Sequence, residues 1–154
     1  MDHKSVAAKL LRHEVMKQTS WSVETLAIWL RDGCKCVYCD RDMLESYDVA
    51  YYAESRDHLL PISRYEELGS TGWNLVLACR TCNGLKGDAD PNMSEDPLIY
   101  TKGTRLITDK EREELLQRAT DIIRKKRNDR ERLFQKEREL ILGSLTVVPD
   151  VARK

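Results

Sequence analysis

Two Cys-x-x-Cys pairs, Cys36-Val-Tyr-Cys39 and Cys79-Arg-Thr-Cys82, constrain the fold of this chain more than any other feature of its sequence. A Cys-x-x-Cys turn directs both sulfurs toward one point, and two such turns form the tetrahedral thiolate cage of a structural zinc site. The 39 residues between Cys39 and Cys79 exceed the roughly 15–20 residues of a simple zinc ribbon. We therefore predict that one Zn²⁺ closes a long insertion and that the insertion carries the function.

Other uses of the cysteines fit the sequence less well. A thioredoxin-like redox motif is disfavoured because no βαβ pattern surrounds either pair. Cys34 could replace Cys36 as a ligand, but its longer spacing to Cys39 loses the tight turn, so we expect Cys34 to be a free thiol. Five cysteines without a secretion signal indicate a reducing cytosol rather than a disulfide scaffold.

The insertion and the helix after it contain residues suited to catalysis. A strand is predicted over residues 49–55, running into Arg56-Asp57-His58, and a second strand over residues 74–78, beginning at Asn74. A helix is predicted to start within residues 79–82 and to carry Asn83 and Lys86. Because these two residues are three apart, they lie on one face of that helix.

These motifs, taken together and in order, make residues 34–88 resemble an HNH endonuclease with two zinc knuckles. The resemblance rests on Cys36-Val-Tyr-Cys39, on the stretch from Asp57-His58 to Arg64, and on the stretch from Trp73-Asn74 to Lys86-Gly-Asp88. It implies an α+β fold with a ββα-metal (His-Me finger) core, in which a strand ends in Asp-His, a second strand follows, and a helix carries the last ligand. This sequence has Asn83 where the family name implies His. A neutral oxygen ligand suits a hard cation better than zinc.

The resemblance also implies the roles of the site residues. His58 is expected to be the general base that takes a proton from water, since imidazole titrates near neutral pH. Asp57 and Asn83 are expected to hold one Mg²⁺ or Mn²⁺, whose shell is completed by waters and the scissile phosphate. Asn74 is expected to brace the loop that holds the base, and Lys86 to contact the phosphate.

Charge divides the chain unequally, although its formal net charge is zero. Residues 1–100 hold 11 Lys+Arg and 16 Asp+Glu, a net of −5, and residues 101–154 hold 15 and 10, a net of +5. We expect an HNH domain with N-terminal helices over residues 1–100 and a basic helical extension over residues 101–154. No apolar run approaches a membrane span.

Helices are expected on both sides of the zinc-stapled core. One is predicted over residues 5–17 and another over residues 23–32, with Ser22 as its N-cap and Gly33 as its stop. A long charged helix should start at Thr108, whose spacing to Glu111 is that of a capping box. Its apolar residues fall into two stripes, one of Leu115, Leu116, Ala119, Ile122 and Ile123, the other of Leu133, Phe134, Leu140 and Ile141.

A basic segment separates the two stripes, with six basic and two acidic residues between positions 124 and 132. It is either a solvated, salt-bridged helix face or a segment that contacts phosphates. The interrupted stripe is also compatible with two helices folded back on the core, or with a dimer contact. The candidate nucleic-acid contacts are Lys86, the weaker candidates Arg64 and Arg80, and the basic residues Arg124, Lys125, Lys126 and Arg127.

The sequence therefore favours a metal-dependent endonuclease that hydrolyses phosphodiester bonds. DNA is preferred over RNA as substrate only through the family resemblance, which also suggests a cytoplasmic bacterial or phage protein. The alternative is a zinc-knuckle adaptor that binds nucleic acid or protein without catalysis. Such an adaptor needs the knuckles but not Asp57, His58 and Asn83 together. A homo-oligomer or a partner protein held through the C-terminal helix is compatible with either function.

Overall fold

The computed structural model describes residues 21–69, 71–95, 97–101 and 107–147. These residues form a mixed α and β fold, which confirms the predicted fold class. The helix expected over residues 5–17 lies outside the described residues. The elements follow in the order α2 (Val23–Arg31), a π-helical turn (Val49–Ala53), β1 (Glu54–His58), a 3₁₀ turn (Glu66–Leu68), β2 (Leu75–Cys79), α3 (Arg80–Lys86) and α4 (Asp109–Val147).

The chain divides into two compact units, Met1–Ile123 and Arg124–Lys154. The sheet, α2, α3 and the first turns of α4 belong to the first unit, and the remainder of α4 belongs to the second. The domain boundary expected after residue 100 stays a prediction. Among the helices that the structure describes, none is long and apolar enough to span a bilayer.

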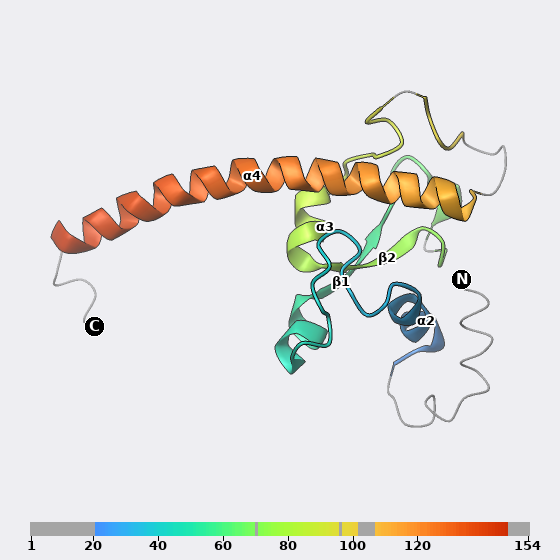
Figure 1. Cartoon of the computed structure of the whole chain (residues 1–154), viewed down its shortest axis with the longest axis horizontal. Coiled ribbons are helices and arrows are strands. Elements are labelled where there is room, and N and C mark those ends of the chain that lie inside the picture. The colour runs from blue at the N-terminus through green and yellow to red at the C-terminus, as the bar shows by residue number, and fades with distance from the viewer. Residues whose placement is uncertain (1–20, 70, 96, 102–106, 148–154) are drawn as a thin grey trace. The chain divides into compact units, whose positions relative to one another are not determined.

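A ββα unit forms the centre of the first unit (Figure 1). β1 pairs with β2 in an antiparallel sheet, with Glu54 opposite Cys79 and His58 opposite Leu75. α3 begins directly where β2 ends and packs against both strands. The predicted functional residues thus lie at the end of β1, immediately before β2, at the junction of β2 with α3, and along α3.

The first strand is shorter than the sequence indicates, and the prediction of a strand from residue 49 is wrong. Residues 49–53 form a π-helical turn, and β1 starts only at Glu54. The antiparallel register explains the difference. Glu54 pairs with Cys79, the last residue of β2, so residues before Glu54 would have to pair with residues after Cys79. Those residues are in α3, and their backbone groups bond within the helix.

Helix α2 follows its sequence signals closely. The Ser22 side chain caps the helix by accepting a hydrogen bond from the Thr25 N–H. After the helix, Gly33 has φ +66°, a left-handed conformation in which glycine has no steric penalty. Ile28 and Trp29 are buried in the core, and α2 packs on β2.

Helix α4 starts with the predicted capping box. The Glu111 carboxylate accepts from the Thr108 N–H at 2.9 Å, and the Thr108 Oγ1 accepts from the Glu111 N–H at 3.3 Å. Leu115, Ala119 and Ile123 of the first stripe are buried in the first unit. The helix is continuous, as the prediction of one long helix requires, and the alternative of two folded-back helices is excluded. The apolar residues of the second stripe are between 53% and 73% exposed, namely Leu133, Phe134, Leu140 and Ile141.

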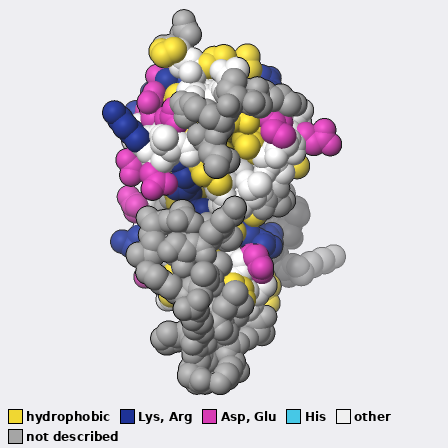
Figure 2. Space-filling view, turned by 90° about the vertical axis from the view of Figure 1, so that its right-hand side faces the viewer, with side chains coloured by type: hydrophobic (Ala, Val, Ile, Leu, Met, Phe, Trp, Pro, Cys, Tyr) yellow, Lys and Arg dark blue, Asp and Glu magenta, His cyan; other side chains and the backbone are white. Residues whose placement is uncertain are grey.

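The two units carry the same opposite net charges as the two sequence segments. Residues 1–123 carry 16 Lys+Arg and 21 Asp+Glu, a net of −5, and residues 124–154 carry 10 and 5, a net of +5. On the face drawn in Figure 2, acidic side chains lie along the left edge with basic ones among them. The first unit, which holds the predicted catalytic residues, is therefore the acidic one.

A buried ion network around Asp32 ties α2 to β2 and α4. The Asp32 carboxylate accepts two hydrogen bonds of 2.7 Å from the Arg31 guanidinium, and it lies 3.5 Å from the Arg112 guanidinium. It also accepts from the Leu77 N–H at 2.8 Å. The Asp32 side chain is only 3% exposed, so this charge is held by its partners rather than by water.

We expect Asp32→Ala to lower the free energy of unfolding by about 3–5 kcal/mol, because it leaves two guanidinium groups and a strand N–H without their acceptor. The measurement is urea denaturation of the metal-loaded protein. Glu45→Ala is the matched control, since the exposed Glu45 lies 3.6 Å from Arg41. Its cost should stay below about 1 kcal/mol. Equal, small effects of both substitutions would show that the network does not stabilise the fold.

Candidate functional site

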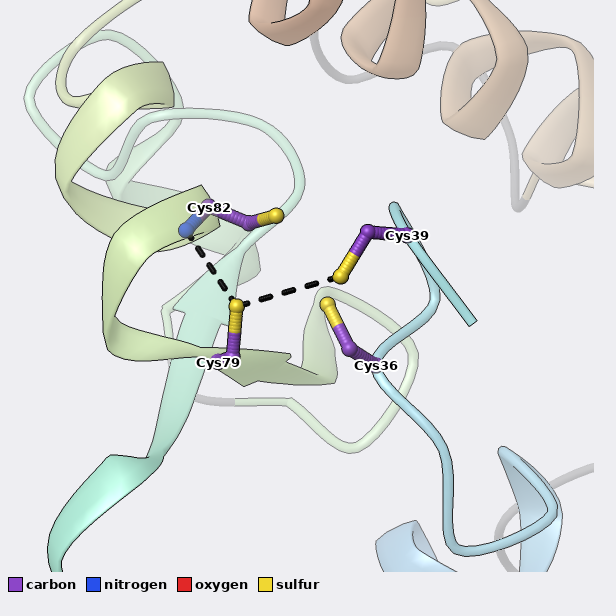
Figure 3. Close-up of side chains that lie close together, drawn as sticks. All are labelled: Cys36, Cys39, Cys79 and Cys82. Carbon is purple, nitrogen blue, oxygen red and sulfur yellow. Dashed lines mark hydrogen bonds between the residues drawn. The ribbon is translucent and has the colours of Figure 1, made fainter. Parts of the chain in front are cut away.

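Four cysteines from three parts of the chain converge on one point (Figure 3). Cys36 and Cys39 come from a tight loop, Cys79 ends β2, and Cys82 lies in the first turn of α3. Their four sulfur atoms all lie within 4.8 Å of one another, and those of Cys39 and Cys79 are 3.9 Å apart. The predicted convergence of the two Cys-x-x-Cys pairs is confirmed.

The cluster has the dimensions of a tetrahedral thiolate site. Four sulfurs about 2.3 Å from a central zinc lie about 3.8 Å from one another, close to the distance between Cys39 and Cys79. Hydrogen bonding to Cys79 raises the pKa of the Cys36 thiol to about 11, whereas Cys79 accepts from its neighbours and its pKa is lowered. Neighbouring thiolates repel one another, so the crowded thiols do not all lose their protons easily. A bound dication offsets this repulsion because it binds the thiolate form.

Cys34 is not part of the cluster formed by the described residues. It is partly buried and has φ 56°. Burial, and then the charge of Asp42, raise the pKa of its thiol. Cys34 is therefore a free thiol of low reactivity, as the spacing argument predicts.

Asp57 and His58 end β1 and point to opposite sides of it, because neighbouring side chains on a strand alternate. Asp57 is 5% exposed, and its Oδ2 accepts from the Tyr38 hydroxyl at 2.7 Å. Its Oδ1 accepts from the Lys86 ammonium at 3.3 Å. Burial raises the pKa of Asp57, although the charge of Lys86 and the Tyr38 hydrogen bond both lower it.

His58 is half-buried at the end of the strand. Burial lowers its pKa below the ordinary 6.5, Asp57 opposes that shift, and the positive charge of Lys86 adds to it. A lowered pKa keeps the imidazole neutral near neutral pH, which is the form that can accept a proton.

Asn74 joins the two ends of the loop between the strands. It is fully buried, and its Oδ1 accepts from the Leu60 N–H at 2.8 Å while its Nδ2 donates to the Leu60 carbonyl at 2.9 Å. Its backbone carbonyl accepts from the Leu59 N–H at 2.8 Å. These bonds fix the chain immediately after His58, and the role of Asn74 in holding the base stays a prediction.

Asn83 on α3 faces β1. Its Nδ2 donates to the Ser55 hydroxyl and, at 3.4 Å, to the Arg56 carbonyl. Because a carbonyl can only accept, this contact orients the amide nitrogen toward the strand and leaves the amide oxygen as the group available to a cation. Asn83 can thus act as a neutral oxygen ligand.

Lys86 does not have the expected surroundings of a phosphate contact. It is 1% exposed, and its ammonium donates to the His58 carbonyl at 2.7 Å as well as to Asp57. In this structure Lys86 supports the end of β1, and its expected contact with the phosphate stays a prediction. Arg64 and Arg80 are exposed, and Arg64 lies 3.7 Å from Asp90. The basic residues from Arg124 to Arg127 belong to the second unit.

The sequence interpretation missed Tyr38 and Ser55 as site residues. Tyr38 lies inside the first Cys-x-x-Cys turn, where its side chain was not assigned a role, yet its hydroxyl reaches Asp57. Ser55 lies two residues before Asp57 and accepts from Asn83. The alternation of β1 offered a signal for Ser55, because residues 55 and 57 lie on the same face.

A ββα unit beside a four-cysteine cluster, with Asp57-His58 at the end of its first strand and Asn83 on its helix, is the arrangement expected of a nuclease-type domain. The family model described as HNH endonuclease matches residues 36–89, which contain the cysteine cluster, both strands and α3. Residues 36–89 are therefore identified as an HNH domain. Searches of curated proteins and of solved structures found no match.

We expect one zinc ion per chain in the purified protein, held by the four cysteines of the cluster. Cys82→Ser should abolish zinc binding and folding together, because metal binding at a closed site is coupled to folding. Elemental analysis and circular dichroism measure the two effects. Cys34→Ser is the control and should keep both the zinc and the fold. A soluble, folded wild-type protein without zinc would contradict the assignment.

Proposed function

We propose that this protein is a metal-dependent endonuclease that hydrolyses phosphodiester bonds in DNA, with a structural Zn²⁺ on its four clustered cysteines. The observation that carries the proposal is the placement of Asp57 and His58 at the end of β1, the strand that Asn83 of α3 contacts at Ser55 and Arg56, within a domain that matches the HNH model. A non-catalytic zinc adaptor has no need for these three residues at one corner of its fold.

His58 is the proposed general base. Hydrolysis of a phosphodiester requires a water that loses a proton as it attacks phosphorus, and an imidazole near neutral pH can take that proton. Lys86 holds the backbone carbonyl of His58, and Asn74 holds the two residues that follow it. The ring is therefore attached to a backbone that is fixed on both sides, which favours a constant position relative to the substrate.

Asp57 and Asn83 are the proposed ligands of one Mg²⁺ or Mn²⁺. Their donor atoms are a carboxylate and an amide oxygen, which suit hard cations. The Asp57 carboxylate accepts one hydrogen bond on each oxygen, from Tyr38 and from Lys86, and keeps lone pairs on both oxygens for a cation. When bound, such an ion supplies stabilisation of the charge that develops on the phosphate and the leaving oxygen.

The basic part of α4 is the proposed source of affinity for the DNA backbone. The first unit is net acidic and should be poorly attracted to a polyanion. Arg124, Lys125 and Lys126 are exposed and Arg127 is half-buried, and together they form the densest positive run in the chain. Contacts of this kind position a protein on nucleic acid without reading its sequence.

His58→Ala should lower the cleavage rate by about 10²–10⁴-fold while leaving zinc content, fold and DNA binding nearly intact, because removing a general base affects only the chemical step. Plasmid nicking with Mg²⁺ or Mn²⁺, with and without EDTA, measures the rate. His13→Ala is the control, since it removes an imidazole from outside residues 36–89. Cleavage by His58→Ala at the wild-type rate would reject the base, and DNA binding without any metal-dependent cleavage by wild type would favour the adaptor.

Replacing Lys125, Lys126 and Arg127 with Gln should flatten the dependence of log affinity on log salt by about one unit per lost phosphate contact. Affinity should fall alike for all DNA sequences. Lys136→Gln with Arg138→Gln is the control, because both residues are exposed and lie on the same helix. Fluorescence anisotropy at several salt concentrations measures the slope.

An unchanged slope in the triple variant would reject the segment as a DNA contact. If light scattering then showed an altered oligomer, α4 would be assigned to assembly instead. The exposed apolar residues of its second stripe make that the main competing use of this helix.

A further inference from the structure

Three side chains from different parts of the HNH domain form one buried cluster around a single negative charge. Tyr38 comes from the first cysteine turn, Asp57 from β1, and Lys86 from the last turn of α3. They are 6%, 5% and 1% exposed. Each oxygen of the Asp57 carboxylate has one of the other two as its donor, with Tyr38 on Oδ2 at 2.7 Å and Lys86 on Oδ1 at 3.3 Å.

Lys86 places a positive charge next to Asp57, the proposed metal ligand. Its ammonium is held by a short bond of 2.7 Å to the His58 carbonyl and by longer ones of 3.3 Å to Asp57 and 3.4 Å to the Gly87 carbonyl. The contact with Asp57 is thus the looser of the two that involve β1. A buried ammonium needs several acceptors. If the Asp57 carboxylate bound another cation, the Lys86 ammonium would keep the carbonyls of His58 and Gly87 as acceptors.

We propose that Lys86 serves as the counter-ion of Asp57 in the metal-free protein and that a divalent metal ion displaces its ammonium from the carboxylate. The inference rests on the proposed function, because it takes Asp57 as a metal ligand. Two positive charges close to one buried carboxylate repel each other strongly in a poorly solvated site. Lys86 therefore lowers the affinity of Asp57 for the metal. In the metal-free protein it also balances the negative charge of the buried carboxylate.

Tyr38 has a different part in the same cluster. Its hydroxyl is neutral, so it can keep donating to Oδ2 when a cation arrives at the carboxylate. Its backbone is fixed by the turn between Cys36 and Cys39, where the Cys36 carbonyl accepts from the Cys39 N–H at 3.3 Å. Tyr38 is thus a positioning residue that connects the cysteine cluster to Asp57.

The test measures Mn²⁺ affinity by electron paramagnetic resonance on full-length, zinc-loaded protein without DNA. Lys86→Met should bind Mn²⁺ about tenfold more tightly, because it removes the positive charge that competes with the metal for Asp57. A neighbouring positive charge changes the proton affinity of a carboxylate by about tenfold or more, and the effect on metal affinity should be of similar size. Tyr38→Phe should bind it more weakly, because the carboxylate loses its orienting donor. Lys110→Met is the control: it makes the same change in net charge at an exposed residue of α4 and should not alter the affinity.

Unchanged or weaker binding by folded Lys86→Met would overturn the inference. If that variant fails to fold, an NMR titration of the wild-type protein with Mg²⁺ tests the inference instead. The ¹⁵N signals of its slowly exchanging lysine ammonium groups are followed during Mg²⁺ titration, and a buried ammonium signal that does not respond at saturation would overturn the inference.

Asp57→Ala separates this failure from failure of the proposed function. If wild type and Asp57→Ala bind Mn²⁺ equally, Asp57 is not a ligand, and both the metal assignment and the inference fall. If only wild type binds Mn²⁺ and Lys86→Met matches it, the metal assignment stands and the displacement of Lys86 is rejected.

Discussion

The convergence of four cysteine sulfurs is the constraint on which the rest of the HNH domain depends. The described core is small, and its sheet has only two strands, a size that is marginal in water without further support. The cluster joins the loop at residues 36–39 to the junction of β2 and α3. It thereby fixes where α3 begins, and the start of α3 determines which strand residues face Asn83 and Lys86.

The same junction sets the length of the first strand and so the position of the site. Because β2 ends at Cys79, β1 has no partner before Glu54 and is restricted to five residues. His58 is the last of these residues, at the point where Asn74 closes the following loop. The proposed metal ligands and the proposed base thus lie in one ββα arrangement, in which Cys79 ends β2 and His58 ends β1.

Patterns that depend on short-range chemistry could be predicted from the sequence. The cap at Ser22, the capping box at Thr108 and the paired cysteine turns each need only a few neighbouring residues, and all three are found in the structure. What could not be predicted depends on partners far away in the chain. Asn92 lies in a stretch whose glycine, proline and aspartate are typical of a linker, yet it is 1% exposed, and its side-chain amide forms hydrogen bonds with Tyr65 and with the backbone of Ile99 and Tyr100.

Lys86 shows the same limit at the site itself. A lysine three residues after Asn83 at the end of a helix suggests a solvated cation that faces substrate, since lysine is almost never fully buried unless it is paired. The pairing comes from Asp57, 29 positions earlier, and it is possible only because the antiparallel strands bring the end of β1 under α3. Once both charges are buried, each becomes costly to leave without a partner. If Asp57 binds a metal ion as proposed, its carboxylate is held before the metal arrives by Lys86, which lies on the helix that also carries Asn83.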